Sequence, residues 1–245
     1  MSDQERLPSY EDLRRALKPP PHTPEADRIF WTVDGPLHSS IWIMSCGSLK
    51  PYAQGTDESN PTWHPISQCP LTEPKVSSVT VEVREIDHWE SNWVEEHSSH
   101  MDPPEPGEPL SGDGFRYGPL PDYDPDLLEE PLSEEQPVYL LECCDQPRPL
   151  GKTFKVVVQP SPGNEFVTIH DYLSTLHPLL LESRDDIIAS LCLTYDRQRP
   201  AEPKLLVNHN YPKRLNFLEL SNFETPASWV NCKRRTRPCP LADDD

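Results

Sequence analysis

Glycine, basic residues and long apolar runs are all scarce in this chain of 245 residues. Only nine glycines are present, and the two glycine-containing stretches GSLKPYAQG and SGDGFRYG lack the spacing of nucleotide-binding loops, which argues against a nucleotide site. No stretch approaches the roughly 18 apolar residues of a membrane span, so we expect no membrane partner. The chain has 22 Lys and Arg against 41 Asp and Glu. This balance argues against nucleic acid as a partner, because phosphate contacts need clustered cations.

Apolar residues are also few, at 35% of the chain, whereas proline is abundant at 31 residues. Ordering a residue costs roughly 1 to 2 kcal/mol of backbone entropy, so segments without an apolar pattern are expected to stay disordered. The clearest such segment is Glu95 to Gln136, where thirteen acidic residues accompany one basic residue, Arg116, and eight prolines. Like charges separated by prolines extend a chain, and we therefore expect a solvated linker here.

The seven cysteines show no repeated Cys-x-x-Cys spacing, and the N-terminus lacks the apolar run of a signal peptide. Both features indicate a reducing, intracellular compartment, and we expect a cytoplasmic protein. The basic cluster Lys233 to Arg237 is either a nuclear-import patch or a solvated terminus. Cys143 and Cys144 are adjacent, and neighbouring cysteines rarely reach disulfide geometry without strain. All seven cysteines are therefore expected to be thiols.

Alternating apolar residues predict several short strands. Val79, Val81 and Val83 alternate with polar residues, which indicates a strand with one buried and one solvated face. Other short runs are rich in Ile, Val, Leu and Trp and are bounded by Gly or Pro turns. These runs are Ile29 to Val33, Ser40 to Cys46, Lys152 to Pro160, KLLVN, RLNFLEL and ASWVNC.

Two helices are expected between these strands. Thr168 and Asp171 have the spacing of a capping box and precede an apolar face of helical period. Pro178 should kink or end this helix, because proline removes a hydrogen-bond donor. Ser183 and Asp186 repeat the capping-box spacing and predict the start of a second helix.

The fold class predicted from these patterns is α+β, with a small mixed domain interrupted by the acidic, proline-rich disordered segment. The expected organisation is a disordered N-terminal tail (1–28), a β-rich first part of the domain (29–93), the acidic linker (94–137), an α+β domain (138–238) and an acidic C-terminal tail (239–245).

The runs KTFKVVVQPSPGNEFVTIHDYLSTLH and KRLNFLELSNFETPASWVNCK resemble a domain of unknown function found in many uncharacterised fungal proteins. The resemblance covers about residues 150–235. It implies a small α+β fold in a fungal-type intracellular protein, and it implies no activity. The residues that match the family's helix entry are Val167, Thr168, Asp171 and Leu173, and those that match its later part are Arg214, Phe217, Leu218 and Trp229.

The best metal candidate is the stretch DHWESNWVEEHSSHMD, which contains His88, Glu95, Glu96 and the closely spaced pair His97 and His100. Their spacing suits metal ligands, but zinc needs three or four converging groups. The stretch also runs into the acidic segment, where we expect no rigid scaffold. We therefore expect no metal and no other cofactor, and a metal site at His97 and His100 is the alternative.

A second group of candidate catalytic residues is His170, Asp171 and His177. A histidine near a carboxylate can act as a general base, but no oxyanion turn or marked nucleophile accompanies these residues. They are expected to be surface or rim histidines beside a helix cap. The alternative is a hydrolase-like or metal-dependent enzyme that uses one of the histidine groups.

Two peptides repeat a Leu-Pro-x-Tyr core, and both lie in segments expected to be disordered. This core resembles the proline-tyrosine peptides that WW domains recognise, in which proline lowers the entropy lost on docking. For the first peptide, a capping box at Ser9 and Asp12 is the competing interpretation. The function expected from the sequence is a noncatalytic interaction module that presents these peptides to WW-domain partners. The candidate partner-binding residues are Leu7, Pro8 and Tyr10 in the first peptide, and Leu120, Pro121 and Tyr123 in the second.

Overall fold

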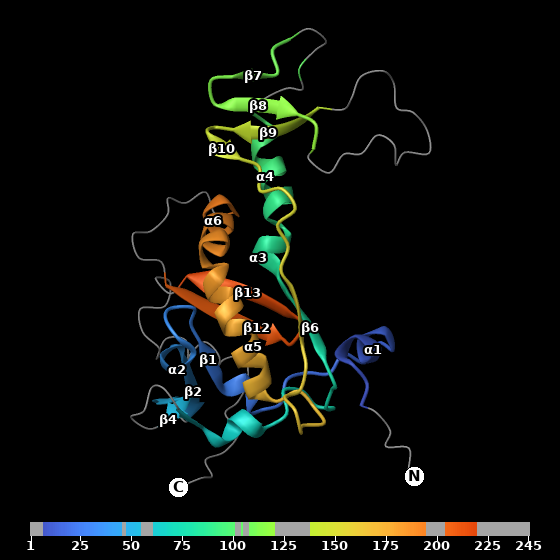
Figure 1. Cartoon of the computed structure of the whole chain (residues 1–245), viewed down its shortest axis with the longest axis vertical. Coiled ribbons are helices and arrows are strands. Elements are labelled where there is room, and N and C mark those ends of the chain that lie inside the picture. Colours follow the sequence, from blue (N-terminus) through green and yellow to red (C-terminus); the bar gives the residue numbers. More distant parts are fainter. Residues whose placement is uncertain are drawn as a thin grey trace. The chain divides into compact units, whose positions relative to one another are not determined.

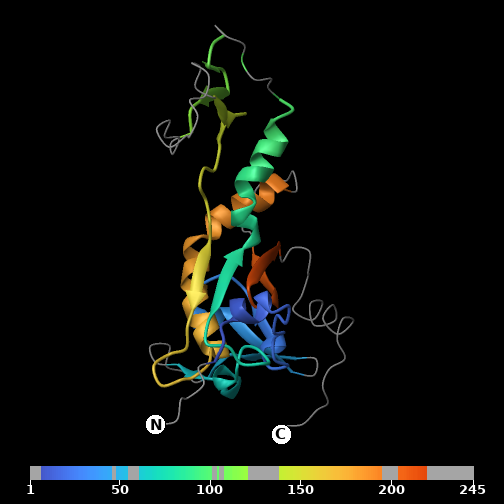
Figure 2. The same ribbon diagram turned by 90° about the vertical axis from the view of Figure 1, so that its right-hand side faces the viewer.

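The chain forms two compact units in a computed structural model (Figures 1 and 2). The main unit comprises residues 1–85 and 153–245, and the inserted unit comprises residues 86–152. Helices combine with antiparallel and mixed sheets, which confirms the α+β class. The division differs from the predicted boundaries, because the insertion begins earlier and ends later than the acidic linker. The structure describes residues 7–45, 48–54, 61–100, 104, 108–120, 138–194 and 204–219.

The main unit is built on a four-stranded sheet with the order β11-β6-β13-β12. The central pair β6 and β13 is parallel, and the two outer pairs are antiparallel. The predicted alternation in β6 is confirmed, because Val79, Val81 and Val83 are fully buried whereas Thr80 and Glu82 between them are half-buried. The strands are β6 (Val79–Val83), β11 (Lys155–Val158), β12 (Leu205–Tyr211) and β13 (Arg214–Glu219).

A second, antiparallel sheet has the order β1-β2-β3. Strands β1 and β2 lie in the two predicted runs Ile29 to Val33 and Ser40 to Cys46, and they pair with each other. The sheet meets β12 where the Val33 amide donates to the Leu205 carbonyl at 3.0 Å. Its elements are η1 (Ala26–Arg28), β1 (Ile29–Trp31), α2 (Leu37–Ser40), β2 (Ile41–Ser45) and β3 (Ser48–Pro51), and beyond it lie β4 (Ala53–Gln54), β5 (Thr62–Trp63) and η2 (Pro65–Gln68).

Helices α5 (Ile169–Glu182) and α6 (Arg184–Thr194) follow one another, as predicted. The capping box at the start of α5 is confirmed: the Asp171 amide donates to Thr168 Oγ1, and the Thr168 amide donates to Asp171 Oδ2. Of the two outcomes expected at Pro178, a kink or an end of the helix, the end is wrong, because α5 continues to Glu182. Leu176 and Leu180 are fully buried on either side of the proline, and their packing offsets the missing hydrogen bond.

The N-terminal segment from residue 7 onward is ordered, so the predicted disordered tail is corrected there. Helix α1 (Tyr10–Arg15) begins with a capping box between Ser9 and Asp12. The Tyr10 side chain is buried, and its amide donates to the Ser78 carbonyl at 2.9 Å. A buried aromatic ring and backbone pairing to the segment before β6 supply the stabilisation that composition did not reveal.

The inserted unit contains helix α4 and a sheet with the order β10-β9-β8-β7, in which all neighbours are antiparallel (Figure 1). Strands β7 and β8 fall within the predicted linker, which is therefore ordered over residues 108–120. Residues 94–97 of that segment belong to α4, and residues 101–103, 105–107 and 121–137 lie outside the described residues. The elements are α3 (Arg84–Asp87), which contains the boundary between the units, α4 (Trp89–His97), β7 (Ser111–Gly112), β8 (Phe115–Gly118), β9 (Tyr139–Cys143) and β10 (Gln146–Pro147).

Several predictions fall on residues that the structure does not describe. They are the strand around Trp229, the basic cluster Lys233 to Arg237 and the tail 239–245. None of the described helices has the length and apolar character needed to cross a bilayer.

Candidate metal centre

Four side chains with metal-binding atoms converge in the inserted unit. They belong to His97, His100, Cys143 and Cys144, and their ligand atoms all lie within 4.8 Å of one another. Nδ1 of His100 is 3.4 Å from Sγ of Cys144 and 3.8 Å from Sγ of Cys143. The two sulfur atoms are 3.7 Å apart. In a tetrahedral zinc site the bond lengths imply about 3.8 Å between two sulfurs and about 3.6 Å between sulfur and nitrogen. The observed separations are close to both values.

The two histidines are positioned by the C-terminal end of α4. His97 is the last residue of the helix and is buried, with its ring stacked on Trp93 at a centroid distance of 4.4 Å. Its Nδ1 donates a hydrogen bond to the Trp93 carbonyl at 2.8 Å. This bond fixes the tautomer and leaves Nε2 as the ligand atom, an arrangement that metal-binding histidines commonly show. His100 follows in a turn in which its amide donates to the His97 carbonyl.

The two cysteines are positioned by the tight turn between β9 and β10. Adjacent residues in a strand point to opposite faces, so two neighbouring sulfurs normally lie far apart. Here Cys144 and Asp145 occupy the turn, with positive φ angles of 52° and 59°. Two-residue hairpin turns of this kind favour glycine and asparagine, and cysteine is unusual at such a position. The turn brings Sγ of Cys144 beside Sγ of Cys143.

The surroundings of the two thiols differ. Cys143 is buried and Cys144 is exposed. Burial, followed by hydrogen bonding with Cys144, raises the pKa of Cys143. The Cys143 thiol therefore holds its proton at neutral pH until a bound cation displaces that proton.

An ion pair at the N-terminal end of α4 also fixes this helix to the segment that follows the β9–β10 hairpin. Glu90, in the first turn of α4, is 2.7 Å from a guanidinium nitrogen of Arg148. The Arg148 amide in turn donates to the Leu141 carbonyl of β9 at 2.8 Å. Glu90 also accepts from the Gly151 amide at 3.2 Å. The start of α4 is thus fixed to the segment around the hairpin, and the four-residue cluster lies where the helix ends.

The sequence identified the histidine half of this cluster and missed the cysteine half. His97 and His100 were recognised by their spacing, but no rigid scaffold was expected, and that expectation is wrong. Cys143 and Cys144 were interpreted only as isolated thiols. The signal that could have identified all four residues as one metal site is the presence of two closely spaced ligand pairs, His-x-x-His and Cys-Cys.

The histidines of α5 contribute to the stability of the main unit. Nδ1 of His177 accepts from Trp31 Nε1 at 3.0 Å, so Nε2 carries the proton and donates to the Gly35 carbonyl at 2.9 Å. His177 is buried, and the prediction of a surface or rim position is wrong for it. His170 stacks on Tyr52 and lies 3.0 Å from its hydroxyl. Burial lowers the pKa of both histidines.

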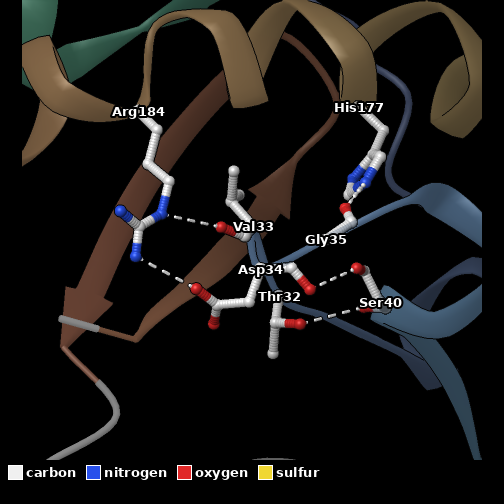
Figure 3. A network of polar contacts seen from close by, with 7 residues as sticks. All are labelled: Thr32, Val33, Asp34, Gly35, Ser40, His177 and Arg184. Carbon is white, nitrogen blue, oxygen red and sulfur yellow. Dashed lines mark hydrogen bonds and ion pairs between the residues drawn. The ribbon is translucent and has the colours of Figure 1, made fainter. Parts of the chain in front are cut away.

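The His177 contact belongs to a polar network that holds the segment between β1 and α2 (Figure 3). Arg184 Nε donates to the Val33 carbonyl, and an Arg184 Nη2 contact of 3.2 Å reaches the Asp34 carboxylate. Ser40 Oγ donates to the Asp34 carbonyl at 2.8 Å. These contacts hold the segment between β1 and α2 against α5 and α6.

The first Leu-Pro-x-Tyr peptide is part of the main unit. Leu7 is half-buried and Pro8 is exposed, but the Tyr10 ring is buried. The Pro8 carbonyl accepts from the Ser77 amide at 2.9 Å. The expectation that Tyr10 lies in a disordered arm is therefore wrong. In the second peptide Leu120 is half-buried, and Pro121 and Tyr123 lie outside the described residues. Binding to WW domains stays a prediction that rests on the second peptide.

No family model, curated protein or solved structure matches this chain. The resemblance to a fungal domain of unknown function stays a prediction.

Proposed function

We propose that the inserted unit is a noncatalytic zinc-binding module, in which His97, His100, Cys143 and Cys144 bind one zinc ion. The observation that carries the proposal is the convergence of four ligand atoms within 4.8 Å of one another. Two histidines come from the end of α4 and two cysteines from the end of the β9 strand and its turn. One zinc ion would link these two elements.

Zinc is the metal that suits this set of donors. Two imidazole nitrogens and two thiolates in a tetrahedral arrangement are typical of zinc, whereas calcium and magnesium prefer oxygen ligands. The separations of 3.4 to 3.8 Å among His100 Nδ1 and the two sulfurs suit three ligands of one zinc ion, and the ligand atom of His97 lies within 4.8 Å of the other three.

The proposed role of the zinc is structural. Four protein ligands complete a tetrahedral site and leave no position for water or substrate, whereas catalytic zinc sites keep one position open. The inserted unit has short strands, and small units with little apolar core often depend on a metal for stability. Zinc binding would then contribute directly to the folding of this unit.

Metal analysis of the purified chain tests the proposal. Under reducing conditions the full chain should bind one zinc ion, measured by inductively coupled plasma mass spectrometry after dialysis. Cys143→Ser and His97→Gln should each lose the bound zinc, because each removes one ligand. Cys192→Ser changes a half-buried cysteine of α6 in the main unit and serves as the matched control that retains zinc. A wild-type chain without zinc, or ligand variants that retain it fully, would contradict the proposal.

A further inference from the structure

We infer that Cys143 and Cys144 form a reversible disulfide when a hydroperoxide oxidises the cluster, and that this reaction expels the zinc. The inference rests on the proposed zinc site. It adds a modification site and a class of co-reactant, the hydroperoxides, to that function. The juxtaposition that carries it is two sulfur atoms 3.7 Å apart, one of them on an exposed residue.

Access distinguishes the two thiols. Cys144 is exposed and lies in the hairpin turn, so a small peroxide can reach its sulfur. Cys143 is buried and is protected from direct attack. Oxidation should therefore begin at Cys144, and Cys143 should act in the second step.

The chemistry balances with one hydroperoxide for each pair of thiols. The Cys144 thiolate attacks a peroxide oxygen, the O–O bond breaks, and a sulfenic acid forms while hydroxide leaves and takes up a proton. The Cys143 sulfur then attacks the Cys144 sulfur, the S–S bond forms, and a second hydroxide leaves and is protonated. The two sulfurs lose two electrons, and the peroxide gains them. Zinc keeps its oxidation state.

Oxidation to the disulfide would remove both thiolates, which are the two negatively charged ligands of the proposed zinc site. A disulfide sulfur carries no negative charge, and only His97 and His100 would remain as ligands. Two histidines do not make up the three or four protein ligands that zinc sites require, so the ion should leave. The link between α4 and the turn would be lost with it.

Strain should make the disulfide easy to reduce. Adjacent Cα atoms are about 3.8 Å apart across a trans peptide, whereas disulfides prefer Cα separations of about 4.4 to 6.8 Å. Strained disulfides have more oxidising potentials and are the labile or regulatory ones. An excess of thiol reductant should therefore restore the dithiol, and added zinc should rebind.

The test uses the zinc-loaded full chain and hydrogen peroxide. Peroxide in equimolar amount should release zinc, followed with a chromogenic chelator. Mass spectrometry should show that the peptide containing Cys143 and Cys144 has lost two hydrogen atoms without gaining oxygen. Dithiothreitol followed by zinc should restore the original metal content. Zinc release with stable gain of oxygen on this peptide, or with a disulfide to a different cysteine, would overturn the inference.

Cys144→His is the discriminating variant. It keeps four nitrogen and sulfur donors, and histidine is among the residues that tolerate positive φ, but it cannot form the disulfide. Once loaded with zinc, it should retain the ion at a peroxide dose that empties the wild type, whereas Cys192→Ser should release zinc like the wild type. Equal release from Cys144→His and the wild type would overturn the inference. If Cys144→His does not bind zinc, the mass of the peptide containing Cys143 and Cys144 from the peroxide-treated wild type still tests the inference. A wild-type chain that binds zinc but keeps it under peroxide refutes the inference alone, and one that never binds zinc refutes the proposed function.

Discussion

His177 has both ring nitrogens engaged in the main unit, and that arrangement has a thermodynamic consequence. Nδ1 accepts from Trp31 and Nε2 donates to Gly35, so the folded state needs the neutral ring. Protonation would convert Nδ1 into a donor facing the Trp31 N–H. Burial accordingly lowers the pKa of His177, and the Gly35 carbonyl offsets this only in part.

The pH dependence of unfolding should reflect this histidine. The unfolded state has an ordinary histidine pKa near about 6.5 and the folded state a lower one, so the unfolded chain binds more protons below that value. Stability is then complete above about pH 6.5 and falls as the pH drops toward the lowered folded pKa. Urea unfolding at pH 8 and pH 5.5 measures the difference. His64 and His170 also have pKa values lowered mainly by burial and should add to it.

His177→Gln provides the comparison, because its amide can both accept and donate but does not titrate. The variant should lose less stability between pH 8 and pH 5.5 than the wild type. An identical loss would mean that His177 is not a source of the pH dependence.

Tyr10 is the residue for which the structure changes the expected effect of a mutation. Its side chain is 4% exposed, so Tyr10→Ala should destabilise the main unit by about 3 kcal/mol, as for other large-to-small changes in a core. Tyr211→Ala is the matched control, since that side chain is 67% exposed and should shift stability by less than about 0.5 kcal/mol. Chemical denaturation measures both. Equal small shifts would place Tyr10 outside the core.

Helices α5 and α6 show which structural features local sequence signals predict and which they do not. The capping box at Thr168 and the alternation of β6 were predicted correctly, because both depend on residues within one turn or one strand. Whether α5 ends at Pro178 or continues past it was left open, because local spacing does not reveal that Leu180, beyond the proline, is fully buried. Tertiary packing overrides local propensity in this helix.

The cap of α5 can be tested directly. Thr168→Ala removes the oxygen that accepts from the Asp171 amide, and it also removes a hydroxyl that donates to the Asp171 carboxylate. The expected cost is about 1 kcal/mol. Thr194→Ala makes the same chemical change at the exposed last residue of α6 and should cost less than about 0.5 kcal/mol. Similar melting shifts for the two variants would argue against a stabilising cap at Thr168.

At the scale of the whole chain, the inserted unit shows where sequence reasoning is weakest. Acidic and proline-rich composition predicted a disordered linker, and it does not reveal that β8 pairs with β9 across residues 121–137. That long-range pairing brings the cysteines near His97 and His100, which precede them by more than forty positions. The sequence predicted two of the four candidate ligands, His97 and His100, because they are closely spaced in one segment. Spacing along the chain gives no signal for ligands on two segments that come together only in the fold.

Zinc X-ray absorption spectroscopy of the reduced, zinc-loaded full chain tests the central claim most directly. The proposed site predicts a first shell of two sulfur atoms at about 2.3 Å and two histidine nitrogens at about 2.0 to 2.1 Å. The outer-shell signals of imidazole should be present in the wild type. A first shell of oxygen atoms alone, or one without sulfur, would contradict zinc binding by His97, His100, Cys143 and Cys144.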